Sequence, residues 1–196
     1  PIPNVEINKD AELSRTLAEL LESIEGREGD QLAGAVQDTS TILFTDVIES
    51  TALSHTMGSV EWSKLVGDHL RQVGDIVERC GGSVVKTLGD GGMYAFQSAS
   101  SALTAAGDIQ MALIGSELQV RIGAHTGDVV RDRDDYVGLT VAKAARVASA
   151  ADGGQVLVSA STAAMVNPAE FAFGEPVTVD LKGLEGTHLL QTLLWS

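Results

Sequence analysis

The sequence predicts an α+β fold: a ferredoxin-like, palm-type βαββαβ core with an antiparallel-dominated sheet and extra α/β elements at its C-terminal end. The main observation is that short apolar, strand-like runs alternate with helical patterns in that order from about Thr39 onward. In addition, 44% hydrophobic residues support a core, and 21 glycines against 4 prolines suit a turn-rich α/β domain. We therefore expect one domain with a short N-terminal appendage.

The core is expected between residues 39 and 130. Its elements, in order, are a buried strand at 39–47, a helical stretch through Met57, a helix at about 60–79, a strand hairpin at 83–88 and 92–97, a helix at 99–114 and a long strand at 118–130. After a mixed-charge loop at 131–135 follow a helix at 139–150, a strand at 155–158, a helix at 160–166 and strands near 176–180 and 188–194. This order predicts an antiparallel sheet with helices on one face.

Residues 1–38 are interpreted as an N-terminal helix and linker, and residues 39–196 as the main domain. Leu13, Leu17, Leu20 and Ile24 form an apolar seam within a helix expected at 10–25. Two interpretations remain open: a short dimer-forming coil, or an amphipathic helix packed on its own domain. Gly26 ends the helix, and residues 26–38 are typical of a linker.

Composition excludes several classes of function. The formal net charge is −14 without a basic stripe, which argues against binding to a nucleic-acid backbone. The single cysteine, Cys80, excludes an intrachain disulfide and suits a reducing compartment. No apolar stretch approaches the roughly 20 residues that a membrane span needs, and no signal peptide is recognised. We therefore expect a cytoplasmic location.

Two isolated aspartates mark a candidate metal site. Asp46 ends the apolar run at 41–45, and Asp90 lies in a glycine turn after the strand that carries Lys86. Carboxylates at the ends of neighbouring strands can hold Mg²⁺ or Mn²⁺, which bind through one or two carboxylates plus substrate phosphates. The alternative is that Asp46 caps the next helix and Asp90 sits in an ordinary hairpin turn.

With these motifs in place, the chain resembles the catalytic domain of bacterial class III nucleotidyl cyclases from about Thr41 to Leu194. The matching segments, in order, are FTDVIEST at 44–51, KTLGDG at 86–91, RIGAHTG at 121–127, YVG at 136–138 with AARV at 144–147, GGQVLVS at 153–159 and LKG at 181–183. Each segment alone is a weak signal, but six in order with suitable spacing are a strong one.

The resemblance implies the roles of the site residues. Asp46, Asp90 and the backbone carbonyl of Val47 would hold two Mg²⁺ or Mn²⁺ ions, which activate the ribose 3′-hydroxyl and clamp the attacking and leaving oxygens. Arg146 would stabilise charge on the α-phosphoryl oxygens. Lys182 would lie against the terminal phosphates, although a solvated lysine in a Lys-Gly turn is an equally open interpretation.

The resemblance also implies that Lys86 and Asp135 select the base. Lysine can only donate and so suits adenine N1, whereas aspartate accepts and so suits the 6-amino group; guanine presents the opposite pattern. This pairing favours ATP over GTP. Because Asp135 lies in a mixed-charge loop, a solvated turn and a register in which Asp134 takes this role are both left open.

One position departs from the family pattern. Ala142 stands where the family commonly has an asparagine, four residues before Arg146 and on the same helix face. Losing such a contact typically costs about 10²–10³ in rate. The departure predicts a slow enzyme, or a substitute such as Lys143 or a water, although Lys143 is expected to point away from that face.

The resulting hypothesis is an adenylate cyclase that makes 3′,5′-cyclic AMP and pyrophosphate from ATP. The resemblance implies a homodimer with composite sites, in which one subunit supplies the metal aspartates and the other the base-selecting pair and Arg146. The hairpin agrees, because a bound nucleotide cannot easily reach both Asp90 and Lys86 of one chain. The alternatives are a cyclase-like regulatory or dimerisation domain with little activity, which Ala142 favours, and a guanylate cyclase.

Overall fold

The computed structural model describes residues 36–132 and 135–195. The helix expected at 10–25, most of the linker, and Asp134 lie outside these ranges. The division of the chain into 1–38 and 39–196 thus stays a prediction, although the first strand already begins at Val36.

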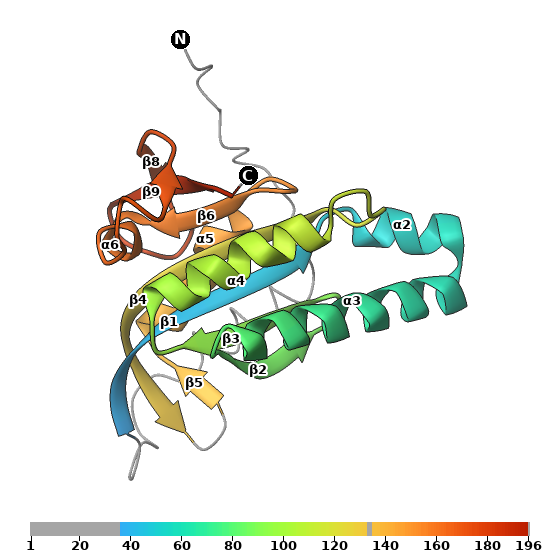
Figure 1. The fold of residues 1–196 in the computed structure, drawn as a ribbon, viewed down its shortest axis with the longest axis horizontal. Coiled ribbons are helices and arrows are strands. Elements are labelled where there is room, and N and C mark those ends of the chain that lie inside the picture. The colour runs from blue at the N-terminus through green and yellow to red at the C-terminus, as the bar shows by residue number, and fades with distance from the viewer. Residues whose placement is uncertain (1–35, 133–134, 196) are drawn as a thin grey trace.

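Strands and helices alternate along the described chain (Figure 1). The elements are β1 (Val36–Val47), α2 (Ser50–Met57), α3 (Ser59–Arg79), β2 (Ser83–Leu88), β3 (Gly91–Phe96), α4 (Ala99–Ala112), β4 (Val120–Asp132), β5 (Asp135–Val137), α5 (Leu139–Ser149), β6 (Val156–Ser159), α6 (Ala160–Ala163), β7 (Ala172–Phe173), β8 (Val177–Asp180) and β9 (Thr187–Leu194). The predicted α+β fold is confirmed. Within the described ranges, every helix is too short or too polar to span a bilayer.

The strands form one sheet in the order β2-β3-β1-β4-β6-β9-β7, with β5 paired to β4 and β8 to β9. The β4–β6 pair is parallel, whereas the other pairs are antiparallel. In the long β1–β4 pair, Asp46 lies directly opposite Arg121. Directly opposed residues share a face of a sheet, so this register determines what the first candidate metal ligand contacts.

Both faces of the sheet are covered. Helices α3 and α4 pack on one face, where Leu43 and Tyr94 belong to the larger apolar cluster. Helix α5 lies on the opposite face, behind the sheet in Figure 1. Its alanines and Val141 pack on Ile42 and Phe44. The expected helices on one face are thus α3 and α4, and α5 adds a layer behind the sheet. Because side chains of a strand alternate between faces, Asp46 follows Ile42 and Phe44 on the α5 side.

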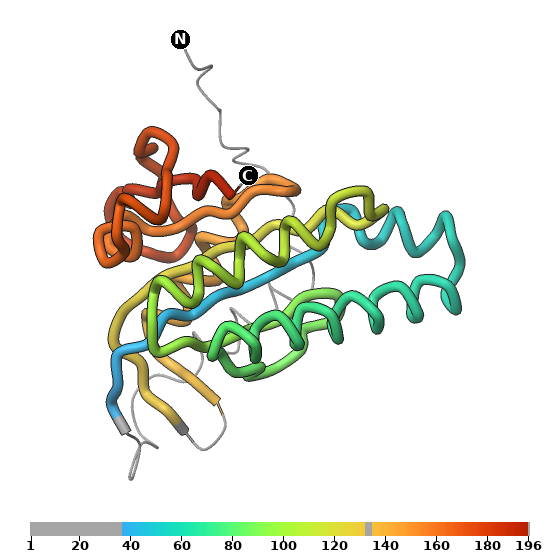
Figure 2. The backbone as a smooth tube through the Cα atoms, viewed as in Figure 1, coloured from blue at the N-terminus to red at the C-terminus, as the bar shows by residue number. Residues whose placement is uncertain are grey.

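Three details differ from the expected elements. A short strand, β5, begins at the end of the expected 131–135 loop, because Tyr136 is buried against the α5 cluster and the segment pairs back onto β4. Strand β7 is additional, and α6 is shorter than the expected 160–166. Figure 2 shows that the α2–α3 hairpin projects past the end of β1, beside the turn that carries Asp90.

Candidate active site

Asp46, the second-last residue of β1, lies in a buried ion pair. Its Oδ2 accepts hydrogen bonds from Arg121 Nε at 2.8 Å and Nη2 at 2.6 Å, and both residues are only 2% exposed. Arg121 Nη1 also donates to the backbone carbonyl of Ser149, at the end of α5, at 3.3 Å. The guanidinium therefore joins β1, β4 and α5 at one end of the sheet.

Asp90 lies in the β2–β3 turn and is 7% exposed. Burial raises the pKa of its carboxyl above the ordinary value; a hydrogen bond from Ser50 opposes this shift, and the nearby charge of Asp46 adds to it. Its Oδ2 is buried and accepts no hydrogen bond from any described residue. A buried carboxylate oxygen without a partner is costly, and a cation would satisfy it.

These features suit a divalent cation. Asp46 and Asp90 are close enough for their charges to interact, and the Val47 carbonyl follows Asp46 directly. Among the described residues, no three or more acidic, histidine or cysteine side chains are grouped so that they could hold a metal ion. Two carboxylates and a carbonyl suit Mg²⁺ or Mn²⁺ when substrate phosphates complete the coordination.

A cavity of about 540 Å³ adjoins Asp90 between α2, α3 and the β2–β3 turn. Its polar lining residues are Asp90 and the hydroxyl residues Ser50, Thr51, Ser54 and Ser63. Its other lining residues are Trp62, Val66, Gly67, Leu70 and Gly89. The carboxylate end of the site is thus open to a polar ligand.

The proposed base-selecting residues lie in contact. Lys86 Nζ donates to both carboxylate oxygens of Asp135, at 2.7 and 2.8 Å, and both side chains are about 30% exposed. A register irregularity after Val84 places Lys86 opposite Met93, whose side chain belongs to the α5 face. The β4–β5 hairpin brings Asp135 to the same place. Asp134 cannot be compared, since it is outside the described residues.

Arg146 and Ala142 lie one turn apart on α5 and are 8% and 7% exposed. Lys143 lies on another side of the helix, where its charge acts on His125 and His188. Burial lowers the pKa of His125 to about 4, and the charges of Lys143 and His188 contribute. This placement agrees with the expectation that Lys143 points away from the Ala142 face.

The structure does not bring every predicted residue together within one chain. Lys182 is exposed in the turn after β8. Strand β8 pairs with β9 toward one end of the strand order, whereas the turn with Asp90 joins β2 and β3 at the other end. Lys86 lies four residues before Asp90, which corresponds to about 13 Å along a strand. The roles predicted for Lys86, Asp135, Arg146 and Lys182 remain predictions.

Sequence reasoning did not single out Arg121. The signal was present, because a charged residue between Val120 and Ile122 in an apolar strand is almost never buried unless it is paired. Glu49 is a second residue that the sequence did not single out. It is the only described non-glycine residue with a positive φ, at 54°, and it immediately precedes α2. Backbone strain of this kind often occurs at functional sites.

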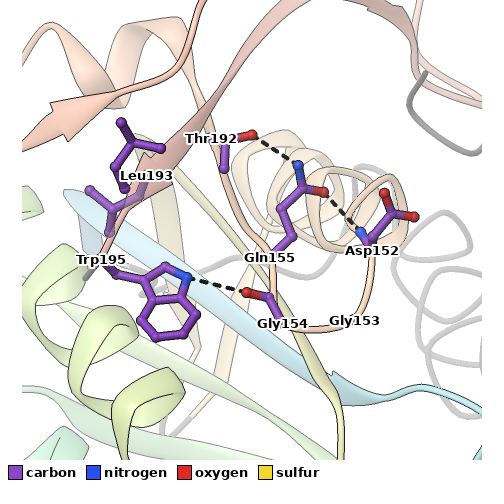
Figure 3. Close-up of a pocket in the computed structure, with 8 residues that line it drawn as sticks. Asp152, Gly153, Gly154, Gln155, Thr192, Leu193 and Trp195 are labelled. Carbon is purple, nitrogen blue, oxygen red and sulfur yellow. Dashed lines mark hydrogen bonds between the residues drawn. The ribbon is translucent and has the colours of Figure 1, made fainter. Parts of the chain in front are cut away.

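A second cavity, of about 390 Å³, lies between residues 152–155 and the end of β9 (Figure 3). Trp195 Nε1 donates to the Gly154 carbonyl at 3.2 Å, and Gln155 Nε2 donates to Thr192 Oγ1 at 2.9 Å. Asp152 carries the only charge among its described lining residues. None of the predicted site residues lines this cavity, so it is not the candidate active site.

Comparison with known proteins agrees with this geometry. Residues 34–193 match the model of the adenylate and guanylate cyclase catalytic domain, so the chain belongs to this family of class III nucleotidyl cyclases. An adenylate cyclase of Mycosarcoma maydis is 32% identical over 184 residues, covering 77% of this chain but 7% of the relative. The chain therefore spans a small part of that longer protein.

Two solved structures share the fold. The adenylyl cyclase CyaB of P. aeruginosa superposes with a TM-score of 0.76 at 20% identity, covering 83% of this chain and 96% of the other. The guanylyl cyclase Cya2 gives a TM-score of 0.74 at 23% identity, covering 82% and 93%. Because both adenylyl and guanylyl cyclases are similar to this chain, the base must be argued from the site.

Proposed function

We propose that the protein is an adenylate cyclase, which converts ATP to 3′,5′-cyclic AMP and pyrophosphate. The observation that carries this proposal is the Lys86–Asp135 contact, at 2.7 and 2.8 Å. The contact holds one donor and one acceptor side by side, as adenine N1 and the 6-amino group require. The M. maydis relative, an adenylate cyclase, also supports ATP.

In the proposed reaction, the ribose 3′-oxygen loses its proton and forms a bond to the α-phosphorus, and the bond from the α-phosphorus to pyrophosphate breaks. Asp46, Asp90 and the Val47 carbonyl would hold two Mg²⁺ or Mn²⁺ ions. Bound there, the ions lower the pKa of the 3′-hydroxyl and neutralise charge on the leaving pyrophosphate.

Two cationic residues serve the phosphates in this proposal. Arg146 donates to the α-phosphoryl oxygens, where negative charge grows in the transition state. Lys182 lies against the terminal phosphates as a point charge. Since Lys182 is remote from Asp90 in the strand order of one chain, its role requires a second subunit.

We therefore propose a homodimer with two composite sites. One subunit supplies Asp46, Val47 and Asp90, and its partner supplies the Lys86–Asp135 pair and the cationic residues. Two-fold symmetry makes both sites equivalent. We place the reaction in the cytoplasm, in keeping with the single cysteine and the need for ATP.

A specific observation favours a second candidate, a cyclase-like regulatory or dimerisation domain with little activity. Ala142 offers no side-chain hydrogen bond on the face that carries Arg146, and Lys143 lies beside His125 and His188 instead. The nucleophile then lacks one orienting contact, and turnover is slow.

The deciding experiment incubates the purified chain with ATP and Mn²⁺ and detects cyclic AMP directly. We expect cyclic AMP from the wild type and none from Asp46→Asn or Asp90→Asn. Asparagine is preferred to alanine at 46 because its oxygen can still accept from Arg121. Asp75→Asn, on the exposed side of α3, is the matched control and should be fully active. Activity in either site variant would refute the metal assignment, and a folded but inactive wild type would favour the regulatory domain.

A further inference from the structure

The buried Arg121–Asp46 pair makes more hydrogen bonds than are needed to fill its place in the core. A buried ion pair contributes little net stability, because desolvation of both charges offsets their attraction. Here the guanidinium donates twice to the same oxygen, Oδ2 of Asp46, and a third time to the Ser149 carbonyl. The pair lies at the position where the proposed function requires a cation ligand.

The guanidinium also acts on the second carboxylate. Its positive charge attracts the Asp90 carboxylate, whereas the negative charge of Asp46 repels it. Arg121 thus contributes one positive charge to a site with two carboxylates, so the formal charge of the trio is −1 rather than −2. A cation that enters this site meets weaker attraction and some direct repulsion.

We propose that Arg121 is a positioning residue that sets the affinity of the site for divalent cations in the absence of nucleotide. It donates two hydrogen bonds to Oδ2 of Asp46 and so orients the carboxylate. Only Oδ1 of Asp46 then remains for a cation. It also weakens binding of the cation alone, so that tight binding requires the phosphates of the substrate. This inference rests on the proposed function.

The test measures Mn²⁺ binding to the full chain without nucleotide, by electron paramagnetic resonance and calorimetry. Arg121→Met keeps the unbranched apolar stem of the side chain and removes the guanidinium with its charge. We expect it to bind Mn²⁺ at least about tenfold more tightly than the wild type. The matched control is Arg71→Met, which removes the same charge from an exposed pair with Asp68 and should leave the affinity unchanged.

Thermal unfolding gives a second readout. Without metal, Arg121→Met leaves the Asp46 carboxylate buried without its partner, so its Tm should fall. Added Mn²⁺ should then raise Tm by more than it does in the wild type, because a tighter ligand stabilises the folded state more. If the methionine variant does not fold, Arg121→Gln, which can still donate to Oδ2, replaces it in both measurements.

The outcomes separate this inference from the proposed function. If the folded Arg121 variant and Arg71→Met bind Mn²⁺ equally, the inference is overturned while the metal site stands. If the wild type binds no Mn²⁺ even with a non-cyclisable ATP analogue, and Asp46→Asn changes nothing, the metal site itself is wrong and both proposals fail.

Discussion

The Lys86–Asp135 ion pair makes a quantitative prediction about base choice. Guanine would set its N1–H against the lysine and its 6-oxygen against the aspartate, which leaves two polar contacts unmade. Each such loss costs about 1–3 kcal/mol, so ATP should be preferred over GTP by roughly 30-fold to 10⁴-fold in kcat/KM.

The same contact predicts that Lys86 and Asp135 must be replaced together to change the preferred base. Lys86→Glu alone would place a second carboxylate where Lys86 Nζ now lies 2.7 Å from Asp135, and Asp135→Ser alone would remove the acceptor that holds the lysine. Each single variant should therefore lose activity with ATP and gain none with GTP. The double variant supplies an acceptor for N1–H and a hydroxyl donor for the 6-oxygen, and should shift the preference toward GTP by at least about 10².

The assay measures kcat/KM for both nucleotides by quantifying both cyclic products. The control makes the same replacements, Arg71→Glu and Asp68→Ser, in an exposed ion pair. It should leave the preference for ATP over GTP unchanged. Equal use of ATP and GTP by the wild type would refute the reasoning, and so would a gain of GTP activity in Lys86→Glu alone that equals the double variant.

Four further predictions follow from other residues. Mixing inactive Asp46→Asn with inactive Arg146→Ala should restore about a quarter of wild-type activity at equal amounts, because half of the dimers are mixed and each has one intact site; no recovery despite subunit exchange contradicts the composite site. Ala142→Asn should raise kcat by more than it changes KM, and an unchanged kcat in a folded variant means that another group already orients the ribose. Burial lowers the pKa of His69 to about 4, below its unfolded value of 6.5, so His69 should reduce stability by up to about 3 kcal/mol as pH drops from 6.5 toward 4; urea titrations should show that His69→Leu removes this share of the loss and leaves the share of His125, whereas exposed His55→Gln removes none. Glu49→Gly should raise the free energy of unfolding by about 0.5–1 kcal/mol by relieving the positive φ, and an unchanged denaturation midpoint would show that no strain is present.

Much of the fold could be predicted because its signals are local. Helix α3 shows its buried stripe in the spacing of Val66, Val73, Ile76 and Val77, and Gly89 and Asp90 mark the hairpin turn. The order of these elements was sufficient to predict the βαββαβ core. Strand β5 was missed because it is only three residues long and follows a run of charged residues, and the burial of Tyr136 makes its pairing with β4 favourable.

The candidate site was predictable residue by residue but not as an arrangement. Asp46 and Arg121 are 75 residues apart in sequence and meet only through the β1–β4 register. The choice between Asp134 and Asp135 also could not be made from a run of charges. The contact of Asp135 with Lys86 favours Asp135 for the proposed role.

The site and the core on the α5 face belong to one packed arrangement. On β1, Ile42 and Phe44 pack against α5, and Asp46 is the next residue on that face. On β4, Gly123 lies opposite Phe44 and has no room for a Cβ, which would come within 2.0 Å of the Ala148 nitrogen. This close approach brings the next α5 residue, Ser149, within reach of Arg121. Alanine substitutions at Asp46 or Arg121 would therefore disturb α5 as well as charge. Asp46→Asn keeps the shape of its side chain, and Arg121→Gln keeps a donor for Asp46, so these two variants remove charge with less disturbance of the packing.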